Sequence, residues 1–401
     1  MIYDTFTNNK KHFSFLVLMN PIKIYLQYPW KFPDSPYYKY LVEDPPEEVE
    51  YLNVEKQKGV IINKRKILIL GLLKNIIRGS MKRLNLPIIN LHKTKSRENY
   101  DLIHCAHCLS ANDFPWVADF ESIWQLYISG EKTNLGKKKV KKILMNKKCK
   151  KILAWTEKTK KDFEAEFPEI KNKIELVYPA ISFPTKIRKI KSNKIKLLFA
   201  GRSFYEKGGL DALKSMDALT RKYKNVEAVV ISKIPEEISK KYSQNKKIRI
   251  LDLVTREKLR EIYSGIDIFV YPGYTDTFGF GILECASFGI PTISVEGAIG
   301  EDSKKELIED GVTGFLIPAS KEKPQKIKFS WGQATLLSEI ERKENSKIIE
   351  KIIEKTSILI DNKKLREKMS KNCVEIVKNG RFSIKERNKK IKKIYDEALN
   401  Y

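Results

Sequence analysis

Two successive series of short apolar runs, rich in β-branched residues, alternate with amphipathic segments along this chain. The first series includes IKIYLQ, YDLIHCA and PWVADF, and the second includes KIKLLFA, VEAVVIS, KIRIL, IDIFVY and GFLIP. Apolar runs of this length fit buried strands, and the amphipathic segments between them fit helices that cover a sheet. The pattern therefore predicts the α/β class, with two doubly wound units built on parallel sheets that face each other.

The chain is long enough for two such units. It has 401 residues, whereas a single hydrophobic core stops growing near about 250–300 residues. The segment 178–194 is rich in Pro and Lys and shows no periodic apolar pattern. We therefore expect the boundary between the two units to lie there.

The charge of the chain favours anionic partners. Lys and Arg number 77 against 50 Asp and Glu, which gives a formal net charge of +27. Such a surplus attracts nucleotides, anionic lipid headgroups or nucleic acid. Five unevenly spaced cysteines do not form a disulfide framework, so a reducing, cytoplasmic compartment is expected.

The first residues are expected to lie outside the folded part. The apolar run FSFLVLM follows two lysines but is short, ends before Pro21 and has no small-residue cleavage site. We therefore expect 1–18 to be a disordered or misassigned extension rather than a signal peptide. No run in the chain reaches the ~18 apolar residues of a transmembrane helix.

The stretch GYTDTFGFGILECASFG follows the strand-like run IDIFVYP and predicts a ligand site. In open α/β sheets, ligands bind at the carboxyl ends of strands, beside helix N-termini. A helix beginning near Gly279 would offer a phosphate the free N–H groups of Phe280–Ile282, and Gly281 would permit close approach. Glu284, one turn inside, could accept the hydroxyls of a ribose. Asp276, before the helix, could bind a second polyol, so the pattern suits a nucleotide-sugar.

A second element supplies positive charge. Gly201 and Arg202 follow the strand-like run KIKLLFA, and Lys207 comes just before the glycine pair that opens the next helix. Two cations near a helix N-terminus can neutralise a diphosphate and stabilise it as a leaving group.

The segments GRSFYEKGG, VTREKLREIYSGIDIFVYPGYTDTFGFGILECASFGIPTISVEG and LIEDGVTGFLIP occur in that order over residues ~195–400. Together they resemble the C-terminal domain of family 4 retaining glycosyltransferases, also called glycosyl transferases group 1, which have the GT-B fold. The resemblance implies a hexosyltransferase that uses a UDP- or GDP-linked sugar and retains the anomeric configuration.

The resemblance also implies roles for individual residues. Arg202 and Lys207 would hold the diphosphate, Glu284 the ribose and Asp276 the donor sugar, while the backbone at Leu251–Val254 would receive the base. The expected catalytic residues are Arg202, Lys207, Asp276 and Asp119. The expected donor-binding residues are Gly201, Arg202, Lys207, Leu251, Val254, Phe278, Gly279, Phe280, Gly281, Ile282 and Glu284.

Several positions depart from the family pattern. The family's acidic pair is normally E-x7-E, but the first acid here is Asp276, one methylene shorter. YPWKFPDSPYY replaces the glycine-rich loop after the first strand. In PWVADFES, Asp119 and Glu121 stand where many members carry Thr-x-His, and either could touch the acceptor hydroxyl or the sugar. The chain has no D-x-D, so neither a metal nor another cofactor is implied.

The segment HCAHC combines His104, Cys105, His107 and Cys108. A structural zinc site needs four ligands, and no second ligand pair lies nearby in the sequence. Incidental cysteines at a strand end are therefore the preferred interpretation. Two interpretations of His104 and His107 stay open: one of them lines the cleft, or both are structural.

Two segments, 71–84 and 136–153, are both basic and apolar. They fit docking onto the anionic inner face of a membrane, where lipid-linked acceptors reside, and equally fit solvated helices packed on a sheet. No nucleic-acid-binding motif accompanies the lysines, so nucleic acid is not the expected partner.

Four regions are expected, the last of them from the resemblance. They are the extension 1–18, an acceptor-binding domain 19–185, a nucleotide-sugar-binding domain 186–380 and a final helix, 381–401, that crosses back to the first domain. The acceptor is not identified and could be a lipid-linked molecule, a glycan or a glycoprotein. Two alternative functions are an epimerase or hydrolase of nucleotide-sugars on the same fold, and a non-catalytic basic scaffold.

Overall fold

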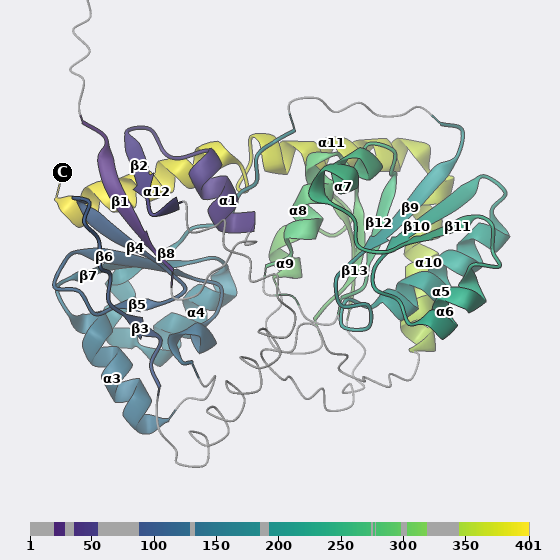
Figure 1. Cartoon of the computed structure of the whole chain (residues 1–401). Helices are drawn as coiled ribbons and strands as arrows, with labels where there is room; N and C mark the ends of the chain where they lie inside the picture. Colours follow the sequence, from purple (N-terminus) through teal and green to yellow (C-terminus); the bar gives the residue numbers. More distant parts are fainter. Residues whose placement is uncertain are drawn as a thin grey trace, which may run out of the picture.

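The computed structural model describes residues 20–28, 36–54, 88–128, 133–184, 192–273, 276, 278–297, 303–318 and 345–400. The predicted extension 1–18 and the basic segment 71–84 lie outside these ranges. The described residues form two α/β domains side by side, the N-terminal one purple to blue and the C-terminal one teal to green (Figure 1).

The N-terminal domain is built on a six-stranded parallel sheet with the order β2-β1-β4-β6-β7-β8. Its two central strands, β4 and β6, are buried along their whole length, as expected for a sheet covered on both faces. Its strands are β1 (Ile22–Gln27), β2 (Val49–Leu52), β4 (Leu102–Ala106), β6 (Trp116–Phe120), β7 (Cys149–Ala154) and β8 (Ile174–Leu176), with a separate parallel pair of β3 (Leu91–His92) and β5 (Leu109–Ser110). Its helices are α1 (Pro36–Glu43), α3 (Asn134–Met145) and α4 (Glu157–Glu166), with 3-10 turns η2 (Ile123–Leu126) and η3 (Pro168–Lys173).

The C-terminal domain has a second six-stranded parallel sheet, with the order β11-β10-β9-β12-β13-β14. Its strands are β9 (Ile195–Ala200), β10 (Val226–Ile231), β11 (Ile248–Leu251), β12 (Ile268–Tyr271), β13 (Thr292–Val295) and β14 (Gly314–Ile317). Its helices are α5 (Gly209–Lys222), α6 (Glu236–Tyr242), α7 (Arg256–Tyr263), α8 (Phe280–Ser287), α9 (Lys304–Leu307), α10 (Ser346–Asp361) and α11 (Lys363–Lys378). The predicted α/β class with two parallel sheets is confirmed.

Each sheet reverses its strand order at one pair of neighbours. The N-terminal sheet reverses between β1 and β4, and the C-terminal sheet between β9 and β12. The loops that follow two such strands run to opposite faces of the sheet. A crevice therefore forms between them at the carboxyl edge. In the C-terminal domain these loops begin at Gly201 and Pro272, which brings the two predicted donor-site elements together.

The carboxyl edges of the two sheets face each other. Trp155, directly after β7, packs edge-on against Phe278 and Phe280, with ring centroids 6.1 and 6.0 Å away. Beside them, a Glu306 carboxylate oxygen of α9 accepts a hydrogen bond from the Glu157 amide at the start of α4, at 2.9 Å. Buried apolar residues from both domains form one cluster across this boundary, and a second cluster lies within the N-terminal domain.

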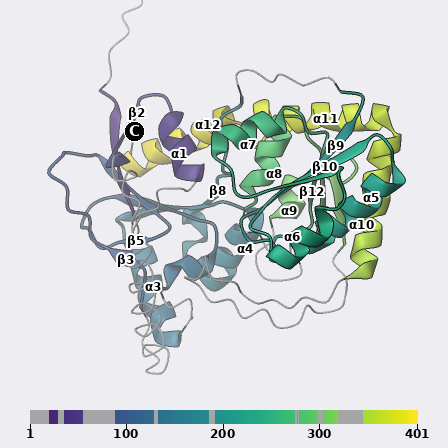
Figure 2. The ribbon, with the colours of Figure 1, turned by 45° about the vertical axis from the view of Figure 1, so that its right-hand side comes forward.

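The last helix, α12 (Ile384–Leu399), packs on the N-terminal domain. The yellow helices α11 and α12 run along one side of both domains, which both views show (Figure 1, Figure 2). The Tyr395 hydroxyl lies 2.6 Å from His104 Nδ1 and 3.0 Å from the Tyr51 hydroxyl. The buried Arg387 donates a hydrogen bond of 2.6 Å to the Asp44 carbonyl. These polar contacts fix the end of the chain to β2, β4 and α1.

Tyr395→Phe is expected to lower the free energy of unfolding by about 1–3 kcal/mol, because it leaves the buried ring nitrogen of His104 without its partner. Urea unfolding followed by circular dichroism measures this change. Tyr100→Phe is the matched control, because the Tyr100 hydroxyl makes no hydrogen bond to any described residue. Equal stability of the two variants would contradict the assigned role of Tyr395.

Candidate functional site

The reversal of the C-terminal sheet brings two predicted site residues into contact. Lys207 Nζ lies 3.6 Å from Asp276 Oδ2, and the Tyr271 hydroxyl donates a 2.7 Å hydrogen bond to the same carboxylate oxygen. Burial, and next the neighbouring Asp276, raise the pKa of Tyr271 well above its usual value, so this hydroxyl keeps its proton and remains a donor. Asp276 is only 9% exposed, and the hydrogen bond from Tyr271 holds its carboxylate in place.

Two glycines allow the loop that carries Lys207 to pack closely against the loop after β12. A Cβ at Gly201 would lie 3.1 Å from the Lys207 Cβ, closer than packed side chains normally approach. Gly208 has a φ of +72° at the cap of α5, and a Cβ there would meet the Pro272 ring at 2.7 Å. The Lys207 carbonyl then accepts a hydrogen bond from the Gly273 amide at 3.0 Å, which ties the two loops together.

Arg202 and the predicted base-binding loop lie at the same edge of the sheet. The Arg202 side chain is exposed and makes no ion pair with any described residue, so it is not part of the Lys207–Asp276 contact. Leu251 ends β11, and its carbonyl accepts a hydrogen bond from the Ser232 amide at 3.1 Å. The Ser232 hydroxyl in turn donates to the Gly201 carbonyl at 2.6 Å. Val254 is half-buried two residues before α7.

The helix predicted to begin near Gly279 is α8. Gly279 caps it with a φ of +94°, and a Cβ there would lie 2.8 Å from Leu307 Cδ1. A Cβ at Gly281 would meet no atom within 4 Å, so this side of the first turn is open. The Ile282 amide was expected to be free for a phosphate, but it donates a hydrogen bond to the Gly279 carbonyl at 2.9 Å. The Ile282 side chain is buried. Of the three amides predicted to bind an anion here, those of Phe280 and Gly281 make no hydrogen bond to a described residue.

Two side chains that the sequence did not single out hold the loop before α8. Ser303 Oγ donates a hydrogen bond to the carbonyl of the buried Phe278, and Lys304 Nζ donates one to the Gly273 carbonyl. Lys304 is fully buried, which is rare for a lysine unless its charge is compensated. The segment from 303 onward carries no motif that signals this role.

Glu284 pairs with an arginine that sequence reasoning also missed. Arg256 lies 3.4 Å from Glu284 Oε1, and the Tyr263 hydroxyl lies 3.4 Å from Oε2. Burial raises the pKa of the Glu284 carboxyl above its usual value, and Arg256 opposes this shift. The Arg256 guanidinium also lies over the ring of Tyr40 in the N-terminal domain, at 5.3 Å. The carboxylate predicted to bind the ribose is thus already paired with Arg256, which also contacts Tyr40 of the other domain.

Asp119, predicted to touch the acceptor or the sugar, is fully buried in the N-terminal domain. His104 Nε2 lies 2.9 Å from Asp119 Oδ2, and His107 Nδ1 lies 3.3 Å from Oδ1. The Tyr38 hydroxyl donates a hydrogen bond to Asp119 Oδ1. Asp119 therefore bonds to His104 and Tyr38, lies beside His107, and has no exposed surface that a substrate could touch.

The neighbouring cysteines are packed in the sheet. Cys105 and Cys108 are buried, and Gln27 Nε2 lies 3.5 Å from the sulfur of each. In the part of the chain that the structure describes, no group of three or more His, Cys, Asp or Glu side chains is arranged to hold a metal ion. Within the same ranges, no helix is both long and apolar enough to cross a membrane.

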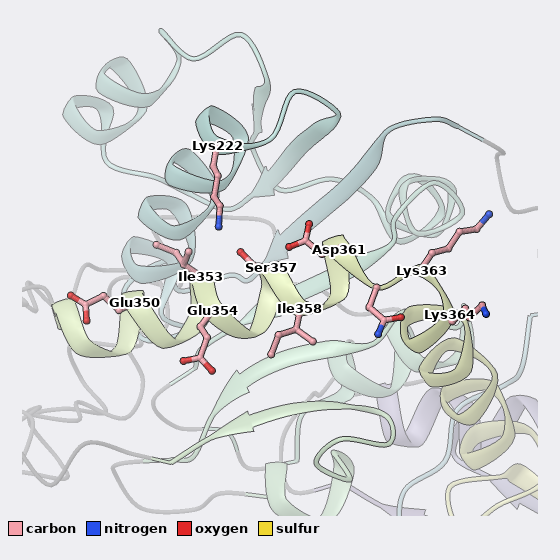
Figure 3. A pocket seen from close by; sticks show the side chains of 10 residues that line it. Lys222, Glu350, Ile353, Glu354, Ser357, Ile358, Asp361, Lys363 and Lys364 are labelled. Atoms are coloured by element: carbon pink, nitrogen blue, oxygen red, sulfur yellow. The ribbon is translucent and has the colours of Figure 1, made fainter.

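A separate hollow lies on the surface of the C-terminal domain, with a volume of about 870 Å³ (Figure 3). Its lining comes from α10 and the starts or ends of α5 and α11, and no residue of the loops after β9 or β12 belongs to it. Its charged lining consists of Glu350, Glu354 and Asp361 of α10, Lys222 at the end of α5, and Lys363 and Lys364 at the start of α11 (Figure 3). It is therefore distinct from the candidate donor site.

A family model described as glycosyl transferases group 1 matches residues 183–331, which confirms the predicted resemblance over this segment. Among curated proteins, no sequence matches this chain.

Solved structures with the same fold include a glycosyltransferase from Rickettsia africae ESF-5, at 16% identity and a TM-score of 0.58, covering 95% of this chain and 99% of that one. Another is sucrose-phosphate synthase from Thermosynechococcus elongatus, at 12% identity and a TM-score of 0.59, with 95% and 99% coverage. A third is Anabaena Alr3699/HepE in complex with UDP and glucose, at 14% identity and a TM-score of 0.52, with 93% and 98% coverage. These similarities confirm the GT-B fold that the sequence predicts.

The two glycines at the start of α8 should respond differently to the same substitution. Gly279→Ala is expected to lower the free energy of unfolding by about 1–3 kcal/mol, because alanine disfavours the left-handed backbone and its Cβ meets Leu307. Gly281→Ala is the matched control and should be neutral or stabilising by up to about 1 kcal/mol. Thermal melting of both variants tests this, and equal destabilisation would contradict the described helix start.

Proposed function

We propose that the protein is a retaining hexosyltransferase, and the match of residues 183–331 to the family model of glycosyl transferases group 1 supports this proposal. It transfers a sugar from a UDP- or GDP-linked donor to a hydroxyl of an acceptor. The observation that carries the proposal is the meeting of Lys207 and Asp276 at the crevice of the C-terminal sheet, beside the open start of α8. The nearness of Asp276 to the cap of α8 also supports the proposal, because its Oδ2 would lie 3.8 Å from a Cβ at Gly279.

The chemistry of the proposed site is stabilisation of a leaving group. The bond between the anomeric carbon and the diphosphate oxygen breaks, and its electron pair leaves with the nucleoside diphosphate. Lys207 and the Phe280 and Gly281 amides stabilise the charge that develops on the diphosphate. Arg202, exposed at the same edge, closes onto the phosphate oxygens as a second cation. In this proposal the cations neutralise the diphosphate without a metal ion.

The donor replaces contacts that are already present in the protein. The sugar hydroxyls bind Asp276, which is held by Tyr271 while Lys207 turns toward the phosphates. The ribose hydroxyls bind Glu284, where they compete with Arg256. Because Arg256 lies over Tyr40, ribose binding also loosens a contact between the domains.

A donor screen tests the proposal. UDP-, GDP- and ADP-glucose and GDP-mannose are added to the wild type and to the double variant Arg202→Ala with Glu284→Ala. A donor at 100 times its Kd should stabilise the wild type by about 2.7 kcal/mol, which is a melting shift of a few degrees. The double variant should lose this shift. Arg249→Ala, which removes an exposed arginine from β11, is the matched control and should keep it.

The outcomes separate the alternatives. Stabilisation by one donor, followed by sugar transfer to an acceptor extract, supports the transferase. Release of free or altered sugar without any acceptor would instead indicate an epimerase or hydrolase. No stabilisation by any nucleotide-sugar would contradict the proposed function and leave a basic scaffold.

We further propose that the acceptor lies at an anionic membrane, which α3 contacts. The outward face of α3 carries Lys138, Lys139 and Lys142 between Leu135 and Met145, which are 55% and 51% exposed. These residues follow helical spacing and no acidic side chain stands among them. An apolar and basic stripe of this kind fits the headgroup region of a bilayer.

Vesicle flotation tests this contact. Wild type should bind vesicles that contain 30% phosphatidylglycerol, and replacing the three α3 lysines by Gln should weaken binding about tenfold or more, since each contributes about 1 kcal/mol near an anionic surface. The same change at Lys222, Lys363 and Lys364 removes equal charge around the surface hollow and is the matched control. Equal losses in both triple variants would contradict a specific role of α3.

A further inference from the structure

The short helix α9 and its cap residue hold both ends of the donor loop, the segment 272–279 between β12 and α8. At the first end, Lys304 Nζ donates a hydrogen bond to the Gly273 carbonyl. At the other end, Ser303 Oγ donates one to the Phe278 carbonyl. Lys304 and Ser303 are 0% and 1% exposed, so little water competes for these hydrogen bonds. The position of the donor loop therefore depends on the position of α9.

The same contacts extend to the groups proposed to bind the diphosphate. The Gly273 amide donates a hydrogen bond to the Lys207 carbonyl at 3.0 Å. Leu307 of α9 packs against the cap of α8, since a Cβ at Gly279 would lie 2.8 Å from its Cδ1. Helix α9 is thus linked both to the loop that carries Lys207 and to the start of α8.

Helix α9 is also bound to the N-terminal domain, which it faces (Figure 1). The carboxylate of Glu306 accepts hydrogen bonds from the first two amides of α4, those of Glu157 at 2.9 Å and Lys158 at 3.3 Å. The Tyr178 hydroxyl donates another at 2.9 Å. Burial, and next the hydrogen bond to Glu306, raise the pKa of Tyr178, so this hydroxyl keeps its proton and remains a donor. One side chain of α9 therefore binds two segments of the other domain.

Helix α9 is too short to fix its own position. It has four residues, and isolated helices shorter than about 12 residues are marginal in water. Its place is therefore set by its contacts with the donor loop and with α4. A further contact comes from Arg381 after α11, which donates a hydrogen bond of 2.5 Å to the Glu306 carbonyl. Because α9 lies between these partners, a change on one side of it alters its hold on the other.

We propose that Glu306 is a positioning residue of the donor site. By binding the start of α4 it fixes α9, and α9 fixes the donor loop in the form that binds a nucleoside diphosphate. This inference rests on the proposed function. The link is reciprocal, because a ligand that favours this form of the loop must favour the contact between Glu306 and α4 by the same factor.

The test changes the contact between the domains without altering the donor loop. Glu306→Gln replaces one of the two acceptor oxygens by an NH₂ group, which cannot accept a hydrogen bond from an amide. Tyr178→Phe removes the hydroxyl and keeps the ring contact with Phe382, whose centroid lies 5.1 Å away. Glu309→Gln removes an exposed carboxylate just after α9 and is the matched control.

Two quantities are measured for each variant: the Kd for UDP and GDP by calorimetry, and amide hydrogen exchange by mass spectrometry. Glu306→Gln and Tyr178→Phe should each raise the nucleotide Kd about three- to tenfold. Without ligand, both should also speed the exchange of the Gly273 and Ile282 amides, which donate hydrogen bonds within the donor site. Glu309→Gln should leave both quantities unchanged.

Reciprocity separates positioning from a simple loss of stability. In the wild type, the nucleotide should slow exchange of the Glu157 and Lys158 amides, although α4 belongs to the other domain. Glu306→Gln should lose this slowing. A variant that is only less stable would exchange faster in every peptide and keep the slowing by nucleotide, which would contradict the proposal. A misfolded variant is recognised by its melting curve, and Tyr178→Phe then decides the question.

The outcomes distinguish this inference from the function on which it rests. If the wild type binds a nucleotide but faster exchange is confined to α4 and the Kd stays at the wild-type value in both variants, the positioning role is refuted while the donor site stands. If the wild type binds no nucleotide at all, the proposed function fails and the positioning role falls with it.

Discussion

The reversal of strand order in each parallel sheet is the constraint on which the rest of this structure depends. In a parallel sheet every loop at the carboxyl edge is available to a ligand, but only at the reversal do neighbouring loops turn to opposite faces. In the C-terminal sheet this geometry brings Lys207, from the loop after β9, to Asp276, from the loop after β12. In the N-terminal sheet it presents His107 at the corresponding edge. Because the two edges face each other, the boundary between the domains is where the reactive groups gather.

Charged side chains at the boundary also have partners in the opposite domain. The Glu306 carboxylate accepts hydrogen bonds from the Glu157 amide and the Tyr178 hydroxyl, both at 2.9 Å, and so compensates the positive end of α4. On the other side, Arg256 lies between Glu284 and the ring of Tyr40. Glu306 and Arg256 of the C-terminal domain thus have polar and aromatic partners in the N-terminal domain. The proposed donor must offer better partners than these, and a diphosphate with two polyols has the chemistry to do so.

The fold and the positions of the donor elements could be predicted from the sequence because both depend on local patterns. Alternating apolar runs identify the strands, and the glycines at 279 and 281 predict a helix that begins near Gly279, where α8 is capped. The burial of Asp119 could not be predicted, since it depends on Tyr38 and His104 from other elements. The pairing of Glu284 with Arg256 could not be predicted either, because the sequence of an amphipathic helix does not indicate which carboxylate its arginine will contact. Local patterns therefore predict where a site lies, whereas tertiary packing determines the hydrogen-bond and ion-pair partners of its residues.

The buried carboxylate of Asp119 depends on side chains from several parts of the N-terminal domain. An isolated buried carboxylate is costly, and this one has hydrogen bonds from Tyr38 of α1 and His104 of β4, with His107 beside it. One donor, His104, is fixed in turn by Tyr395 of the last helix, which couples the C-terminus of the chain to the crevice. His107 lies between this carboxylate and that of Glu121. A threonine at this position would carry no charge that needs these partners. The acidic residues on β6 are thus better understood as parts of one rearranged polar network than as separate replacements of catalytic residues.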